Sequence, residues 1–107
     1  MMNHTVDIIR QRESENDGQT IHLYYNEMTG LYQGFGQSAY YTTAVLDPFV
    51  SYSEEMELPV VMLNKSDILK LRQSMQIIEH EHKCYYHFQT RNKIGTRWYK
   101  VWTDSIK

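Results

Sequence analysis

The sequence predicts an α+β fold in which a mostly antiparallel β-sheet packs against one amphipathic helix at about residues 65–81. Residues 64–81 form the one segment with helical periodicity. Most of the remaining chain alternates apolar and polar residues, or is rich in β-branched and aromatic side chains that favour strands. Because a single amphipathic helix cannot bury its apolar face alone, we expect the sheet to cover it.

The predicted helix has apolar residues at spacings of three and four. Asn64 with Asp67, or alternatively Ser66 with its neighbours, is expected to cap its first turn, because these side chains can accept hydrogen bonds from free backbone amides. No glycine or proline marks the end of the helix, so a strand-like segment from residue 84 sets its limit. The apolar stripe comprises Ile68, Leu71, Met75 and Ile78, widened by Leu69 and Ile77.

The segments before the helix are predicted as strands separated by turns. Asp17-Gly18 lies in a polar loop, and Gly30 closes a hairpin connection at residues 27–30. Asp47-Pro48 is expected to end the fourth strand, and Pro59 restricts the fifth to a sheet edge or to the beginning of a strand. The predicted strands are 5–10, 20–26, 31–35, 38–46 and 58–63, with 49–57 as an acidic loop or short edge piece.

Two further strands are predicted after the helix. Residues 83–90 and 96–103 alternate in character, and residues 91–95 form the turn between them. One face of this C-terminal hairpin must be buried, because an isolated ribbon is not stable in water.

The predicted order of elements over residues 5–81 resembles that of the whirly and PUR-type domains, which lay a helix over a curved four-stranded sheet. These families bind single-stranded nucleic acid, so the resemblance in element order implies such a ligand as one hypothesis.

Length and composition are typical of one intracellular domain. A chain of 107 residues with 41% hydrophobic residues is expected to form a single domain, residues 1–107, with one modest core. The polar N-terminal segment does not have the character of a signal peptide, and no apolar segment approaches the length of a membrane span. A single cysteine, Cys84, fits a reducing compartment. We therefore expect a cytoplasmic protein without membrane contact.

Charge is distributed unevenly along the chain. Residues 1–82 hold five basic and twelve acidic residues, a net charge of −7, whereas residues 83–107 hold six basic residues and Asp104 alone, a net charge of +5. A basic segment thus follows an acidic body. The two parts either neutralise each other within the chain or offer complementary surfaces to partners.

Basic and aromatic residues interleave in the predicted C-terminal hairpin. Cations neutralise phosphates and flat rings stack on unpaired bases, so a sheet face with both would bind single-stranded nucleic acid. Ordinary packing of a half-buried hairpin, or a surface for a protein partner, would use the same residue types. The candidate binding residues are Lys83, Tyr85, His87, Arg91, Lys93, Arg97, Trp98, Lys100 and Trp102.

Other clusters of reactive side chains are weaker candidates. His80 and His82, with Cys84 nearby, have residue types that bind zinc, but solvated histidines at a helix end explain them equally well. Cys84 and His87 are expected on opposite faces of a strand, which argues against nucleophilic catalysis. Glu54, Glu55 and Glu57 form an acidic patch without a sign of burial.

Residues 34–39 match the G-x-G-x-x-A form of the dinucleotide fingerprint. The mechanism requires a helix that begins there and presents its amides to a pyrophosphate. Tyr40, Tyr41, Thr42 and Thr43 follow, and they favour a strand rather than a helix. We therefore interpret the match as coincidence.

Together these features predict a small non-enzymatic binding module without metal or cofactor. One hypothesis is binding of single-stranded nucleic acid through the C-terminal hairpin. The alternative is a protein-interaction or self-associating module that uses the same aromatic residues, or the sheet edge near Pro59, and forms homo-oligomers. The sequence does not decide between a nucleic acid and a protein as the partner.

Overall fold

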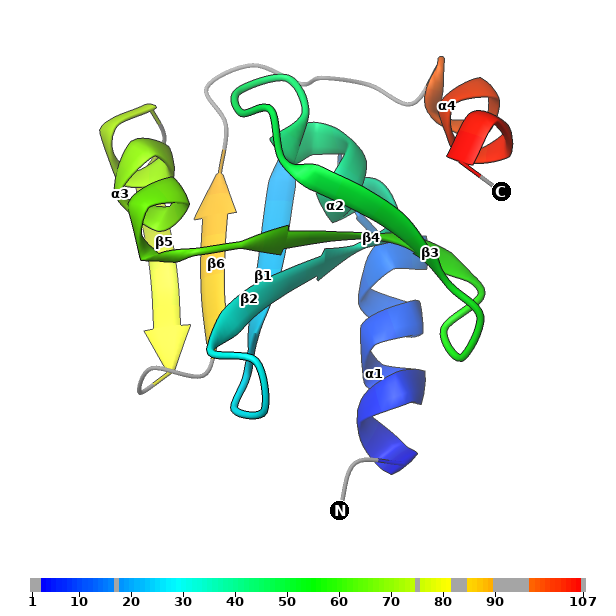
Figure 1. Cartoon of the computed structure of the whole chain (residues 1–107), viewed down its shortest axis with the longest axis horizontal. Helices are drawn as coiled ribbons and strands as arrows, with labels where there is room; N and C mark the ends of the chain where they lie inside the picture. The colour runs from blue at the N-terminus through cyan, green and yellow to red at the C-terminus, as the bar shows by residue number, and fades with distance from the viewer. Residues whose placement is uncertain (1–2, 17, 75, 82–84, 90–96, 107) are drawn as a thin grey trace.

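The computed structural model of the chain describes residues 3–16, 18–74, 76–81, 85–89 and 97–106. Over these residues the predicted α+β class is confirmed, with four helices around one antiparallel sheet (Figure 1). The strands, in spatial order, are β3 (Phe49–Ser53), β4 (Leu58–Leu63), β2 (Leu31–Phe35), β1 (Thr20–Asn26), β6 (Tyr85–Gln89) and β5 (Gln76–Glu81). The helices are α1 (Asn3–Ser14), α2 (Gly36–Thr42), α3 (Lys65–Ser74) and α4 (Tyr99–Ile106).

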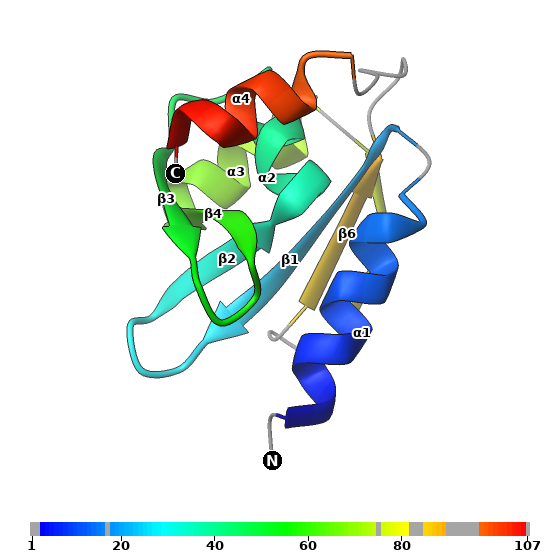
Figure 2. The same ribbon diagram turned by 90° about the vertical axis from the view of Figure 1, so that its right-hand side faces the viewer.

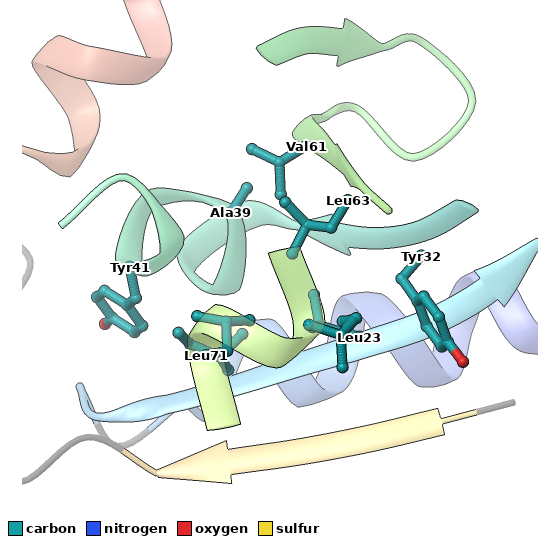
Figure 3. Packing of buried hydrophobic residues seen from close by; sticks show 9 residues of the cluster. Leu23, Tyr32, Ala39, Tyr41, Val61, Leu63 and Leu71 are labelled. Carbon is teal, nitrogen blue, oxygen red and sulfur yellow. The ribbon is translucent and has the colours of Figure 1, made fainter. Parts of the chain in front are cut away.

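The two faces of the sheet pack against different helices. Figure 2 shows α1 on the opposite side of the sheet from α2, α3 and α4. On the α2 side, the buried cluster includes Leu23, Tyr41, Val61, Leu63 and Leu71 (Figure 3). On the α1 side, a smaller cluster contains Ile9, Phe35, Met56 and Val60. Successive residues of a strand point to opposite faces, which is why the neighbours Val60 and Val61 belong to different clusters.

The hairpin of β1 and β2 follows the prediction. Asn26 pairs with Leu31 across the turn, and its carbonyl accepts a hydrogen bond of 2.8 Å from the Gly30 amide. The Asn26 side chain accepts a second bond of 2.9 Å from the Met28 amide. Gly30 has φ of 72°, a conformation that glycine adopts without steric cost.

The predicted strand at residues 5–10 is wrong, because this segment lies within α1. Val6 and Ile9, three residues apart, pack in the cluster on the α1 side, whereas Ile8 is exposed. A spacing of three places Val6 and Ile9 on the same side of a helix. A strand would instead place Val6 and Ile8 on the same side, but these two residues do not pack together.

The predicted strand at residues 38–46 is also wrong, because α2 begins at Gly36 and ends at Thr42. Tertiary packing overrides the strand propensity of this segment, since Ala39 and Tyr41 are completely buried against the sheet. The Thr42 hydroxyl donates a hydrogen bond of 2.7 Å to the Ala39 carbonyl, one turn earlier. A helix does therefore follow the glycine-rich segment, contrary to the sequence interpretation.

The predicted helix at 65–81 is correct only in its first part. α3 ends at Ser74, and residues 76–81 form β5, which pairs with β6. Ile68 and Leu71 are buried as predicted, but Leu69 is exposed. The predicted cap is confirmed: the Asp67 amide donates to Asn64 Oδ1 at 2.9 Å, and the Asn64 amide donates to Asp67 Oδ2 at 3.0 Å.

The predicted C-terminal hairpin is wrong. β6 pairs with β1 and β5, whereas residues 99–106 form α4. A hydrogen bond of 2.9 Å from the Trp102 amide to the Trp98 carbonyl closes the first turn of this helix. The element order therefore differs from the one on which the resemblance to whirly and PUR-type domains was based.

β3 forms one edge of the sheet and covers β4, so Pro59 lies near the beginning of an interior strand and not at an edge. Pro59 is tolerated there as the second residue of β4, opposite Tyr52. The sheet edge near Pro59 is therefore strand β3, and association through that edge stays a prediction. Within the described part of the chain, no helix has the length and apolar character needed to cross a bilayer.

Candidate interaction surface

α4 is held on the molecule by ring packing on its inner side. The Tyr40 ring of α2 lies 5.8 Å from the Tyr99 ring and 5.2 Å from the Trp102 ring, measured between centroids. Trp102 is half-buried and joins the cluster on the α2 side. No residue of α4 is fully buried, so the helix adds a surface layer rather than core.

The outer side of α4 presents apolar and cationic groups together. Trp98 is 58% exposed and Val101, three residues later, is 59% exposed. The Arg97 guanidinium carbon lies 5.1 Å from the centroid of the Trp98 ring, within the range of a cation–π contact. Lys100, two residues after Trp98 in the sequence, is also exposed. We call Arg97, Trp98, Lys100 and Val101 the α4 knob.

The structure brings together two of the predicted binding residues, Arg97 and Trp98, and separates others. Arg97 and Trp98 are exposed directly before α4, and Lys100 is exposed in its first turn. Trp102 is only partly exposed, because its ring packs on Tyr40. The prediction of one sheet face carrying Trp98, Lys100 and Trp102 is therefore wrong, since a helix turns these residues to different sides.

The remaining candidates lie elsewhere. Tyr85 and His87 are in β6, where they pair in register with Tyr24 and His22 of β1. Lys83, Arg91 and Lys93 lie outside the described residues.

The histidine group cannot be placed as a cluster. His80 belongs to β5, whereas His82 and Cys84 lie outside the described residues. The weaker alternative of a metal site there, and the expectation that Cys84 and His87 do not act together, are therefore not tested by the described residues.

A half-open hollow of about 320 Å³ lies over β2, β3 and β4, on the face of the sheet opposite α2 and α4. Its floor is apolar. Phe49 pairs in register with Met62 at its margin and is 69% exposed. The floor consists of Phe35, Met56, Val60 and Met62.

The polar lining of the hollow includes Gln33, Ser51 and the exposed Glu55. Glu57, two residues further on, lies 3.8 Å from Arg10 in an exposed ion pair, whereas no described cation pairs with Glu55. The hollow thus combines a largely buried apolar floor with partly exposed polar groups and an unneutralised carboxylate at its margin. Sequence reasoning found the acidic patch at residues 54–57 but missed the hollow, because residues from four strands and a loop form it.

A buried carboxylate connects α1 to the beginning of α2. Glu13 is 3% exposed, and it accepts hydrogen bonds from the Ser38 amide at 2.8 Å and the Ser38 hydroxyl at 2.6 Å. The His22 amide donates to the same hydroxyl oxygen at 2.9 Å. The amides at the start of this short helix therefore serve a carboxylate of the same chain, and the glycine-rich motif carries no argument for a nucleotide.

Burial raises the pKa of Glu13 to about 7, although the hydrogen bonds from Ser38 oppose the shift. Tyr99 of α4 lies close to this site: its hydroxyl is 3.3 Å from the position that a Cβ on Gly36 would take. Burial, with a smaller effect of the Glu13 charge, raises the pKa of Tyr99. Because Ser38 is completely buried, this group has a structural role and no access for a substrate. Sequence reasoning missed Glu13 because the segment was expected to be a loop.

Comparison with known proteins gives no match: no protein-family model, curated protein or solved structure is similar to this chain.

Proposed function

We propose that the protein is a non-enzymatic interaction module that associates with further copies of itself through the α4 knob. The observation that carries this proposal is the exposed Trp98 ring with the Arg97 guanidinium over it. Tryptophan and arginine are the residues most enriched in the energetic centres of protein interfaces. Exposed apolar side chains that lie together mark interaction surfaces, and the exposed Val101 follows Trp98 by three residues.

Charge supports a second copy as the partner. The C-terminal segment with a net charge of +5 and the preceding body with −7 belong to the same chain. Among the described residues, no ion pair joins Arg97 or Lys100 to a carboxylate, so the knob is not neutralised there. Opposite charges on separate surfaces favour contact between copies. The knob is small, which places the association in the weak, transient class.

Sedimentation equilibrium tests this proposal. Association predicts an average mass above the 12.8 kDa of one chain, rising from micromolar to millimolar concentration and falling with added salt. Trp98→Ala should return the protein to the mass of a monomer. Leu69→Ala is the matched control, because Leu69 on α3 is also 58% exposed and lies outside the knob.

A strictly monomeric wild-type chain over this concentration range would contradict the proposal. An equal loss of association in Leu69→Ala would contradict the assignment to the knob.

Single-stranded nucleic acid is a second candidate partner, and the cation–π pair of Arg97 and Trp98 favours it specifically. It predicts that oligonucleotides quench tryptophan emission, with an affinity that falls steeply with salt. Self-association predicts instead that oligonucleotides leave both the emission and the mass unchanged. The half-burial of Trp102 leaves one freely exposed indole in the described part of the chain, which favours the protein partner.

A further inference from the structure

We propose that the hollow over β2, β3 and β4 receives the Trp98 side chain of a second copy, with Arg97 of that copy against Glu55. This inference rests on the proposed self-association and assigns its second surface. Both surfaces are present on every chain, so no other partner is required.

The shape and chemistry of the hollow suit an aromatic side chain. A volume of about 320 Å³ is near the lower end of the range of roughly 300–1,000 Å³ found for ligand pockets. Met62 is half-buried and offers its thioether to an indole, whereas Phe35 and Met56 are buried and form the apolar wall behind it. Methionine sulfur makes favourable contacts with aromatic rings and its flexible side chain adapts to the shape of a guest.

Phe49 extends this apolar surface at the margin of the hollow. It lies on the edge strand β3 and pairs in register with Met62. Its exposure leaves a second ring available to a guest that enters from the open side.

The charges of the two surfaces are complementary. Glu55 lines the hollow and has no described cationic partner, whereas Arg97 lies directly on the Trp98 ring. A tryptophan seated in the hollow would therefore bring the guanidinium to the acidic margin. Glu54 is exposed next to Glu55 in the sequence but does not line the hollow. It therefore adds to the negative electrostatic potential there without contacting the guest.

The two surfaces cannot meet within one chain. α4 lies on the α2 side of the sheet (Figure 2), whereas the buried residues that line the hollow, Phe35, Met56 and Val60, belong to the cluster on the α1 side. The contact is thus between copies, and it joins two different surfaces. Such a heterologous contact closes into a ring or continues as an open chain, which distinguishes it from a symmetric dimer.

Two variants with reversed charges, one at the hollow and one at the knob, test this inference. Glu55→Lys places a cation at the hollow, and Arg97→Glu places an anion at the knob, so each variant alone should sediment as a monomer. When the two are mixed, each hollow meets a knob of opposite charge, and the mass should return to that of the wild type. Glu54→Lys makes the same change of charge beside the hollow and should retain most of the association. Because Glu55 and Arg97 are exposed, circular dichroism should show both variants folded.

The outcomes separate this inference from the proposed function. Restoration of the mass in the mixture supports the assignment. The hollow is not the receiving surface if the wild type associates and either variant alone has the same average mass as the wild type. The same conclusion follows if the mixture of the two variants stays monomeric. A monomeric wild type contradicts the proposed function itself.

Discussion

Glu13 makes the stability of the fold depend on pH. In the unfolded chain its carboxyl ionises near the ordinary pKa of 4.5, whereas burial holds the proton in the folded chain until about pH 7. Between these values the folded chain binds more protons, so the free energy of unfolding falls as pH rises through this window. The full contribution is present below pH 4.5, and its loss by about pH 7 amounts to about 3 kcal/mol.

Glu13→Gln should remove this dependence, because an amide keeps the shape of the protonated acid and does not ionise. Urea unfolding at a series of pH values would measure it. We expect the variant to match the wild type near pH 5 and to exceed it near pH 8. All other ionisable groups are common to both proteins, so their effects cancel in the comparison. If the free energies of unfolding of the two proteins change with pH in the same way, Glu13 is not held neutral by burial.

At the scale of elements, α3 depends on its cap. Asn64 and Asp67 exchange two hydrogen bonds that satisfy backbone amides at the start of the helix. Asn64→Ala should lower the free energy of unfolding by about 1 kcal/mol, because one amide of the first turn then has no partner in the chain.

Lys65→Ala is the control, since Lys65 is the exposed residue that follows the cap, and a cation near a helix N-terminus adds no stability. Chemical denaturation of both variants would measure the difference. An Asn64→Ala variant as stable as the wild type would mean that water replaces the cap at no cost.

The elements that sequence reasoning assigned correctly have a local signal. β1 and β2 alternate in character and surround a turn with a glycine at positive φ, and the cap of α3 is a pair of polar residues at the correct spacing. α2 was missed because its threonines and tyrosines favour strands, and only the burial of Ala39 and Tyr41 against the sheet makes the helix favourable. That packing involves residues far away in sequence.

α4 was missed for a related reason. Trp98, Lys100 and Trp102 alternate with other residues as in a strand, yet Tyr99 and Trp102 also fit one side of a helix. The Tyr40 ring, with which both of these rings pack, decides between the two patterns. The predicted continuation of α3 fails similarly, because residues 76–81 pair with β6.

At the scale of the whole molecule, the sequence revealed the unequal charge but not which residues lie together. The candidate site reduces to Arg97, Trp98 and Lys100 among the described residues, and the hollow requires the spatial order of β2, β4 and β3. That order is not sequential, since β4 lies between β2 and β3. No local pattern specifies such a neighbour, so the receiving surface was beyond sequence reasoning.

The heterologous geometry permits a complex of defined size. A Trp98→Ala copy keeps its hollow and loses its knob, whereas a Glu55→Lys copy keeps its knob and loses its hollow. Their mixture should therefore stop at one copy of each, suitable for NMR.

The most direct measurement is an isotope-filtered nuclear Overhauser experiment on this mixture, with methionine methyls labelled in the Trp98→Ala copy only. We predict contacts from the indole protons of Trp98 in the unlabelled copy to the methyls of Met56 and Met62, and none to Met28, which is exposed in the turn after β1. A complex in which the indole of Trp98 contacts Met28 but neither Met56 nor Met62 would contradict the account.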